Sequence, residues 1–402
     1  MLLQQLFASR TQRMKASEIR ELLKLLNRPG LLSFAGGIPD PALFPAAEFS
    51  AAFQDCLTPE RQSEALQYSL SEGYLPLREW IRGEMARMGV VCDVDNILIT
   101  SGSQQALDYL GKLFLSPNDT ALVGWPTYLG ALAAFNAYEP RYDQLNPGGN
   151  RSALSYRQAA EAAGSQVKFA YLSPDFANPT GQTLSQQDRD ALLDLSEDLG
   201  CAIVEDGAYQ ALRYDGDQIP SILGLEIARR GDLELCRTIY CGSFSKTLSP
   251  GLRLGWVVAA KPVIAQMVLM KQAADLHSAT LNQMAVHQVA ERCFETHVAQ
   301  LRQAYGDRRD AMLAALQSHM PQGITWTRPE GGMFVWLTLP AHIDAAALLV
   351  RALDEENIAF VPGQAFFADG NGANTLRLSF SVLAPEAIHS GVERLGRLLQ
   401  QA

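Results

Sequence analysis

The sequence has few charged residues and no run of basic ones. Charged side chains make up 19% of its 402 residues, the formal net charge is −10, and no more than two basic residues are adjacent. Proteins that bind phosphate backbones or anionic membrane surfaces concentrate Lys and Arg instead. We therefore predict no nucleic-acid partner and no polybasic attachment to a membrane.

Paired cysteines and long apolar runs are also missing. The six cysteines form no Cys-x-x-Cys pair, which favours a reduced, cytoplasmic protein. The longest apolar run, around "VIAQMVLM", is too short to span a bilayer. The opening "MLLQQLFASR" has no basic residue before its short apolar stretch and no small-residue cleavage pattern. We expect neither an export signal nor a membrane span.

The histidines do not predict a metal site. His277, His287 and His297 recur every ten residues. At 3.6 residues per turn, successive members of this series do not share one helix face, and no carboxylate completes a ligand set. We assign no metal.

What the sequence does contain is a series of short apolar runs between residues 95 and 260. They are "NILIT", "TALVGW", "VKFAYL", "CAIVED", "RTIYCG" and "GWVVAA", and each stops at a polar or glycine-rich turn. Alternation of such runs with helical patterns is typical of parallel strands covered by helices, so we predict an α/β fold. Ligands of such sheets lie beyond the carboxyl ends of the strands.

The length and the apolar content of 48% predict one large domain and a smaller one. We place the large domain at residues 46–280. Residues 1–45 and 281–402 are predicted to form an N-terminal segment and a small C-terminal α+β domain, because helical patterns there lead into the alternating "GGMFVWLTL" and "TLRLSFS". The N-terminal segment is expected to hold an amphipathic helix from about Ser17 to Pro29.

Two of the predicted strands end in residues suited to a flat, anionic ligand. Gly102, Ser103 and Gln104 stand between a strand and a helix, where free backbone N–H groups and the helix dipole attract an anion. An ordinary strand-to-helix turn explains them equally well. Tyr128 follows the next strand and can stack on a ring, and packing in the core is its alternative role.

The following strands deliver an amide, two acids and a phenol. Asn178 lies in the turn "NPTG", and the run "CAIVED" ends in Glu205 and Asp206, with Tyr209 three residues further on. A rigid amide and phenol can bond a ring oxygen, and an acid can pair with a protonated ring nitrogen. A simple turn at Asn178 and a solvated acidic turn at Glu205 and Asp206 are the alternatives.

The stretch "GSFSKTLSPGLRLGW" combines a reactive amine with groups that bind phosphate. Lys246 can act as a covalent amine if burial and neighbouring charge lower its pKa. Ser243, Ser245 and Arg253 supply hydroxyls and a cation suited to a phosphate. A surface loop is the alternative for this stretch taken alone. Together with Asp206 and Asn178, however, it makes a pyridoxal phosphate site.

The motifs resemble those of a fold-type I pyridoxal-phosphate-dependent aminotransferase of class I/II. The likeness is to the 2-aminoadipate/kynurenine aminotransferase branch. The motifs, collinear from about residue 16 to the C-terminus, are "SFAGGIPDPALFP", "LQYSLSEGYLPLRE", "GSQQALD", "NPTG", "DGAY", "SFSKTLSPGLRLG", "RPEGGMFVW" and "NTLRLSFS". The resemblance implies a large domain with a mostly parallel sheet flanked by helices, plus a smaller α+β domain.

The resemblance also implies roles for individual residues. Lys246 would be the Schiff-base lysine and Asp206 the partner of the pyridine nitrogen. The remaining assignments are Asn178 and Tyr209 on the ring oxygen, Tyr128 stacked on the ring, and Gly102, Ser103, Gln104, Ser243, Ser245 and Arg253 around the phosphate. Tyr68 would reach that phosphate from the partner subunit, so a homodimer is implied. Arg377 would bind the substrate α-carboxylate, with a structural salt bridge as its alternative, and Gly37 lies where the N-terminal segment closes over the substrate.

Two positions depart from the pattern of this branch. Ala177 stands where the branch commonly has Gln, and Asp175 stands near where the branch commonly has a small hydroxyl residue, so an extra carboxylate is expected close to the side-chain pocket. Such a charge would disfavour acidic substrates. Arg20, however, matches the branch's mobile arginine for a distal carboxylate, and an exposed helix arginine is its alternative.

The expected reaction is reversible transfer of an amino group between an L-amino acid and a 2-oxo acid such as 2-oxoglutarate. The donors that fit are of the 2-aminoadipate, aromatic, branched-chain and glutamate-like types. A lyase or decarboxylase with the same cofactor is one alternative. A non-enzymatic effector domain of a transcription regulator is another, and it is disfavoured because only about 30 residues precede "SFAGG".

Overall fold

The computed structural model describes residues 3–14 and 28–401. The helix that the sequence predicts from Ser17, and with it Arg20, lies outside these residues. In the described part, no helix is long and apolar enough to cross a membrane.

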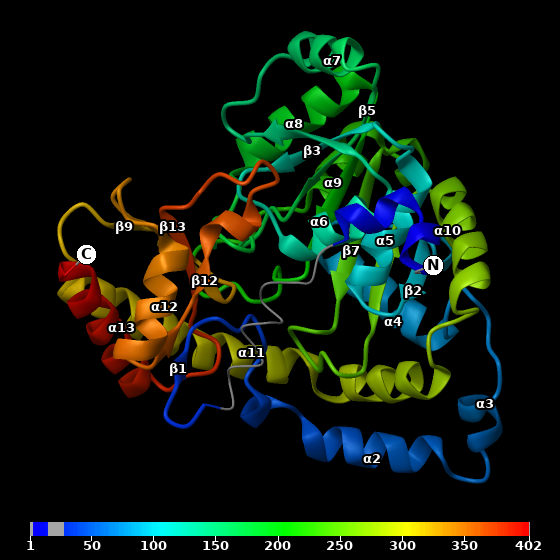
Figure 1. Ribbon diagram of the computed structural model, residues 1–402. Coiled ribbons are helices and arrows are strands. Elements are labelled where there is room, and N and C mark those ends of the chain that lie inside the picture. The colour runs from blue at the N-terminus through cyan, green and yellow to red at the C-terminus, as the bar shows by residue number, and fades with distance from the viewer. Residues whose placement is uncertain (1–2, 15–27, 402) are drawn as a thin grey trace.

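A seven-stranded sheet forms the centre of the larger part of the molecule (Figure 1). Its strand order is β2-β8-β7-β6-β5-β3-β4. The strands are β2 (Ile97–Thr100), β3 (Thr120–Gly124), β4 (Arg141–Leu145), β5 (Val167–Leu172), β6 (Ala202–Asp206), β7 (Thr238–Ser243) and β8 (Gly255–Val258). Strand β8 pairs antiparallel with both neighbours, and all other pairings are parallel. The predicted α/β fold is thus confirmed.

Two details of the sheet differ from the sequence prediction. The run "GWVVAA", expected among the parallel strands, forms the antiparallel β8. An antiparallel partner needs only a short connection, and hydrophobicity does not encode direction. Strand β4 was not predicted, because as an edge strand it is largely polar and only its last residue, Leu145, is buried.

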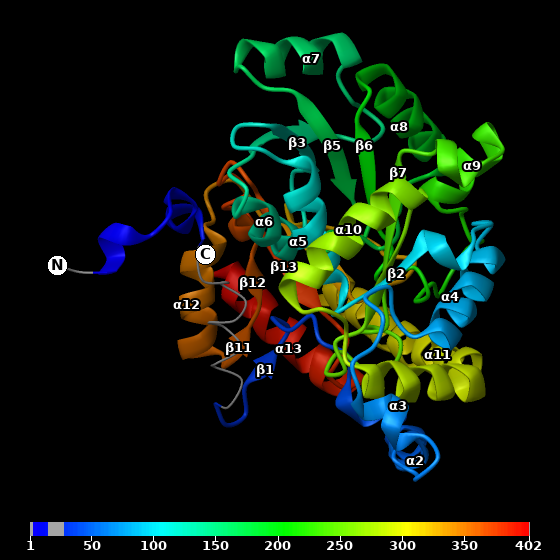
Figure 2. The ribbon, with the colours of Figure 1, turned by 90° about the vertical axis from the view of Figure 1, so that its right-hand side faces the viewer.

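Because side chains point alternately to the two faces of this sheet, helices pack on both faces. One face carries α5 (Ser103–Phe114), α6 (Leu129–Asn136) and α10 (Lys261–Ala274), which pack on residues such as Phe169 and Val204. The other carries α7 (Ala153–Ala162), α8 (Gln186–Leu199) and α9 (Ile222–Arg230), which pack on Ala170 and Ile203. Figure 2 shows α8 and α9 across the sheet from α5 and α6. The loops at the strand ends therefore form the accessible edge.

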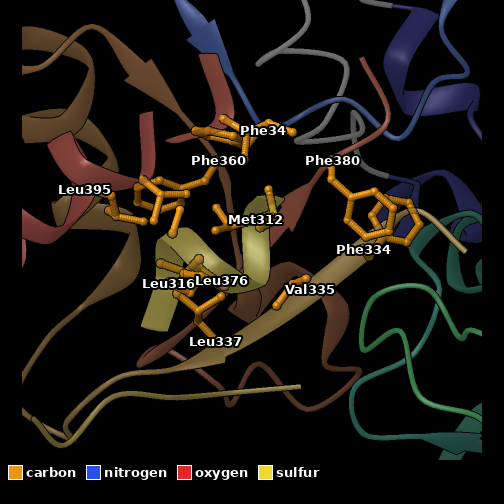
Figure 3. Packing of buried hydrophobic residues seen from close by; sticks show 14 of the residues in the cluster. Phe34, Met312, Leu316, Phe334, Val335, Leu337, Phe360, Leu376, Phe380 and Leu395 are labelled. Carbon is orange, nitrogen blue, oxygen red and sulfur yellow. The ribbon is translucent and has the colours of Figure 1, made fainter. Parts of the chain in front are cut away.

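A second, four-stranded antiparallel sheet lies beside the first in the order β12-β13-β10-β9. Its strands are β9 (Thr325–Trp326), β10 (Phe334–Thr338), β12 (Val361–Pro362) and β13 (Thr375–Ser379), and helices α12 (Ala345–Glu355) and α13 (Pro385–Gln400) accompany it. Figure 3 shows its core, which includes Phe34, Met312, Leu316, Phe334, Val335, Leu337, Phe360, Leu376, Phe380 and Leu395. The N-terminal segment joins this part, because β1 (Leu32–Ser33) pairs with β11 (Ile358–Ala359).

One long helix, α11 (Thr280–His319), passes through both parts of the molecule. Its 40 residues extend about 60 Å at 1.5 Å per residue. It packs against α2 (Ala46–Cys56) and α4 (Leu75–Arg87) on one side and against α13 on the other. The proposed division at residue 280 stays a prediction, because α11 runs through both parts without a break.

Candidate active site

The predicted site residues gather where the carboxyl ends of the parallel strands meet. Gly102 follows β2, Tyr128 follows β3, Asn178 follows β5, Asp206 ends β6 and Ser243 ends β7. Parallel strands place their ends at one edge, so residues at or after the ends of five strands converge there. Arg377 comes from the second sheet, in the middle of β13.

Lys246 lies in the connection between β7 and β8, and its amine contacts the N-terminal segment. Nζ donates a hydrogen bond of 2.9 Å to the carbonyl oxygen of Gly37. Burial, together with the charges of Arg377 and Arg253, lowers the pKa of Lys246 to about 8, and the charge of Asp206 opposes this shift. An amine with this pKa can take up and release a proton near neutral pH.

Asp206 is buried and keeps capacity for a cationic partner. Its Oδ2 accepts a 2.8 Å hydrogen bond from the hydroxyl of Tyr171, and Oδ1 accepts one from the backbone of Ala208 at 3.3 Å. Burial raises the pKa of Asp206, and these two hydrogen bonds oppose that effect. In the described part of the chain, no Lys or Arg forms an ion pair with this carboxylate. It is therefore suited to a protonated ring nitrogen.

Tyr171 is not among the residues that the sequence pattern indicates for the site. The residue lies in β5, where an apolar run with one tyrosine is typical of core packing. The register pairs Tyr171 with Val204, two residues before Asp206 on the neighbouring strand. This pairing is the only sign that Tyr171 lies near Asp206, and it can be recognised only when the strand register is known.

Glu205, next to Asp206, has a structural role instead. Adjacent strand residues face opposite sides of a sheet, and Glu205 accepts hydrogen bonds from the backbone of Ile222 at 2.8 Å and Leu223 at 2.9 Å, in the first turn of α9. Burial raises the pKa of Glu205 to about 7. Both acids are buried, so the alternative of a solvated acidic turn is wrong.

Arg377 is buried without an acidic partner among the described residues. Nη1 donates to Oδ1 of Asn178 and Nη2 to the carbonyl oxygen of Ala35, each over 2.8 Å, while Nε has no partner in the described part of the chain. The guanidinium lies over the rings of Phe334 and Phe366 at 4.3 and 5.1 Å. Burial lowers its pKa to about 10. No salt bridge among the described residues neutralises the charge of Arg377, so its guanidinium can bind an external carboxylate.

The guanidinium of Arg253 lies close to the backbone of Gly102 at the start of α5. Gly102 has φ +82°, and a Cβ there would lie 2.4 Å from Nη2 of Arg253. Only glycine fits both this conformation and this contact. The guanidinium and the N-terminus of α5 at Ser103 thus adjoin each other, an arrangement that suits a phosphate.

The other predicted phosphate contacts lie around this point. Oγ of Ser243 accepts a 3.1 Å hydrogen bond from the backbone N–H of Ser245. The side chain of Gln104 donates to the carbonyl oxygen of Gly130 at 2.7 Å, so it braces the first turn of α6, directly after Tyr128.

Two tyrosines line the site. Tyr128 comes just before α6, and its ring lies against Gly130, where a Cβ would be 2.4 Å from Cζ. The ring of Tyr209 lies 5.6 Å from Nζ of Lys246 and edge-on to Phe334. Burial raises the pKa of both phenols, so they stay protonated and can donate hydrogen bonds.

Tyr68 lies apart from the other predicted residues. It is 79% exposed, and its ring meets that of His277 edge-on at 6.0 Å. Its role across a subunit interface stays a prediction. In the described ranges, no group of three or more His, Cys, Asp or Glu residues is arranged to hold a metal ion.

Asp175 does not add an unbalanced charge to the side-chain pocket, contrary to expectation. One carboxylate oxygen lies 2.8 Å from Nη2 of Arg189 and 3.3 Å from Nη2 of Arg213. The sequence could not predict this, because the partners lie 14 and 38 residues away. Two cations compensate the acid, so the predicted penalty on acidic substrates loses its physical basis.

Comparison with known proteins identifies the family. A family model described as "Aminotransferase class I and II" matches residues 48–395. The chain belongs to this aminotransferase family. It is 44% identical to the 2-aminoadipate transaminase of Thermus thermophilus over 98% of this chain and 96% of that one. It is 40% identical to the aromatic-amino-acid aminotransferase 1 of Thermococcus litoralis over 98% and 94% of the two chains.

A solved structure agrees with this assignment. The aminotransferase is similar to LysN, the α-aminoadipate aminotransferase of Thermus thermophilus, complexed with N-(5'-phosphopyridoxyl)-L-leucine. The TM-score is 0.88 at 41% identity, covering 100% of this chain and 99% of the other. The enzyme transfers amino groups, and its cofactor is pyridoxal phosphate. The geometry fits that cofactor, because it offers a buried acid that forms no ion pair among the described residues, an amine with a lowered pKa and a cradle that a Cβ at Gly102 would fill.

Proposed function

We propose that Lys246 and Arg377 together carry out the amino-group transfer. Arg377 binds the α-carboxylate of the amino acid or oxo acid, because its buried guanidinium has no acidic partner among the described residues and its Nε is free. Lys246 removes the proton from the substrate Cα and returns it, since burial lowers its pKa to about 8. The carbonyl oxygen of Gly37 orients the amine.

The residues around this pair would hold the cofactor. When bound, pyridoxal phosphate carries the migrating amino group and withdraws electrons from the substrate Cα. Asp206, held by Tyr171, keeps its ring nitrogen protonated, while Asn178 and Tyr209 bond the ring oxygen. Tyr128 stacks on the ring, and the phosphate is bound by Gly102, Ser103, Gln104, Ser243, Ser245 and Arg253. These roles are supported by the convergence of all these residues on one edge of the sheet.

We propose donors with medium or large side chains, and 2-oxoglutarate as an acceptor. The relatives are named for 2-aminoadipate and for aromatic amino acids, and LysN was solved with a leucine adduct. The rings of Phe334 and Phe366 flank Arg377 with apolar surface. Arg20 would bind the distal carboxylate of dicarboxylic donors.

The enzyme is proposed to act as a cytoplasmic homodimer in which Tyr68 reaches the partner's phosphate site. The exposed Tyr68 stands between Leu66 and Leu70, which are each 68% exposed. An apolar surface of this kind favours burial against another protein. All six cysteines are free, in keeping with a reducing compartment.

A donor panel tests this proposal. The holoenzyme is given 2-oxoglutarate with L-2-aminoadipate, L-kynurenine, L-tyrosine, L-leucine or L-aspartate, and the L-glutamate formed is quantified. Glutamate equal to the oxo acid released is expected, and Lys246→Ala should form none. Ammonia or carbon dioxide without glutamate would instead indicate a lyase or a decarboxylase. Loss in Arg20→Ala that is confined to dicarboxylic donors would support its role, and a uniform loss or none would remove it.

A further inference from the structure

A buried cluster of one acid and two arginines lies behind the loop that carries Asn178. Asp175 is bonded by Arg189 and Arg213, whose Nη2 atoms lie 2.8 and 3.3 Å from the same carboxylate oxygen. The side chains of Asp175 and Arg189 are only 3% and 0% exposed, and that of Arg213 is 11% exposed. Ions buried to this degree hold a fixed geometry, because leaving any of them unpaired is unfavourable.

Arg189 attaches the cluster to the large sheet. The residue belongs to α8, and its guanidinium donates to the carbonyl oxygens of Leu184 at 3.2 Å, Pro220 at 2.9 Å and Pro174 at 3.3 Å. The residue just before Asp175 and two other loops therefore converge on one guanidinium. Asp175 is fixed at the point where the chain leaves β5.

Arg213 attaches the same acid to the second sheet. Its Nη1 donates to Glu330 at 2.8 Å, and its backbone forms a β-bridge with Gly331. The segment around Glu330 leads into β10, where Trp336 pairs with Arg377 on β13. Through Arg213, Asp175 is thus connected to the segment that leads into β10, the strand that pairs with β13 at Arg377.

The loop between Asp175 and Asn178 needs such support. Phe176 has φ +52°, a conformation that bulky residues rarely adopt. Its ring is 4.8 Å from the Arg213 guanidinium and fills the space beside Gly331, where a Cβ would be 2.5 Å from it. Two residues later, Oδ1 of Asn178 accepts the hydrogen bond from Arg377. Movement of Asp175 would therefore shift the acceptor that aims Arg377.

We propose that Asp175 is a positioning residue for substrate carboxylate binding. Paired with Arg189 and Arg213, it holds Asn178 in place and through it orients Arg377 toward the α-carboxylate. The inference rests on the proposed role of Arg377. It assigns Asp175 an effect on every substrate, since every substrate has an α-carboxylate, and no selective effect on acidic side chains.

The test compares Asp175→Ala and the isosteric Asp175→Asn with Glu226→Gln. Glu226 is a matched control because it too is a buried carboxylate that an arginine contacts, Arg230 at 2.9 Å, but it lies on α9 beside the start of β7. KM and kcat are measured for L-2-aminoadipate, L-leucine and 2-oxoglutarate. Calorimetry gives the Kd of 2-oxoglutarate for the pyridoxal phosphate form of each variant, and thermal unfolding gives its stability.

The proposal predicts that both Asp175 variants raise all three KM values and the Kd by a common factor of about ten, with kcat within about twofold. Glu226→Gln should leave these constants unchanged even where it lowers the Tm. A fall in KM for L-2-aminoadipate alone would overturn the proposal in favour of a charge that repels acidic side chains. Unchanged KM and Kd with a lowered Tm would reduce Asp175 to a structural ion pair. If the wild type transferred no amino group, the proposed function would fail, while the Kd values would still decide the role of Asp175.

Discussion

Nη1 of Arg377 lies 2.8 Å from Oδ1 of Asn178, although 199 residues separate the two in the chain. The bond joins the second sheet to the edge of the first, and it connects a buried cation to a neutral amide. The positive charge of Arg377 is oriented by this contact and is not neutralised by it. The site therefore holds a cation that is oriented to bind a carboxylate.

Arg377→Lys tests that reasoning. The variant keeps the charge and loses the planar fork that grips a carboxylate with two hydrogen bonds, so KM for donor and acceptor should rise about 10- to 100-fold. Steady-state kinetics measure the effect. Arg394→Lys on α13, where the arginine donates to the backbone carbonyl oxygen of Glu356, is the control and should leave KM unchanged. Equal KM values for Arg377→Lys and the wild type would contradict the assignment.

The lowered pKa of Lys246 predicts selective chemical labelling. At pH 8 about half of its amines are uncharged, because its pKa is about 8. Lys261 bonds Asp93, which raises its pKa above 10.5 and keeps it protonated. Pulse labelling of the apoprotein with an amine-reactive reagent, read by mass spectrometry, should give Lys246 a midpoint near pH 8, and pyridoxal phosphate should protect it. A midpoint above pH 10 would refute the prediction.

The lowered pKa of Lys246 also makes the free energy of unfolding depend on pH. The folded apoprotein binds fewer protons at Lys246 than the unfolded chain between about pH 8 and the ordinary value of 10.5, because burial lowers this pKa in the folded state. The free energy of unfolding should therefore gain a rising contribution as pH increases through that window. Urea unfolding at several pH values measures it. Lys246→Met should lack the rise, and an identical pH dependence in both proteins would count against the shift.

Tyr171 should tune Asp206. Its hydroxyl bonds Oδ2 of Asp206 and lowers the pKa of that acid, so Tyr171→Phe should raise it. The acid limb of the profile of kcat/KM against pH should then move to higher pH by about one unit or less, while Tyr142→Phe on β4 should not move it. A shift toward lower pH, or none, would show that the hydroxyl does not act on the acid.

Gly102→Ala should weaken cofactor binding. An added Cβ would lie 2.4 Å from Nη2 of Arg253, so the guanidinium must move. The Kd for pyridoxal phosphate, measured by absorbance titration of the apoprotein, should rise about tenfold, equivalent to about 1.4 kcal/mol. Gly89→Ala is a matched control, because Gly89 has φ +81° and open space around it. Both variants place an alanine at a positive φ that L residues rarely adopt, but only Gly102→Ala should affect the cofactor.

The sequence predicted those parts of the fold and site that depend on local pattern. The apolar runs located most strands of the main sheet, and the residues after them meet at one edge because parallel strands share a direction. Lys246, Asp206 and Asn178 were found in this way. Arg377 was assigned through the resemblance, because its position relative to Asn178 depends on the packing of the two sheets.

What was missed depends on register or on distant pairing. Tyr171 is one apolar-run residue among several until the register places it near Asp206. Glu205 and Asp206 are adjacent in sequence, yet the pleat sends them to opposite faces. Asp175 is neutralised by arginines from two other elements, which no local pattern indicates. The predicted direction of β8 was wrong, because a strand buries the same side chains in either direction.

That reversed strand has a consequence for how this enzyme can be altered. Since β8 returns directly from β7, the reactive amine and the guanidinium at Arg253 share one connection of residues 244–254. Lengthening or shortening this loop by a single residue would displace nucleophile and anion holder together. Engineers who wish to reshape one of the two must therefore work by replacing side chains and keep the length of the hairpin constant.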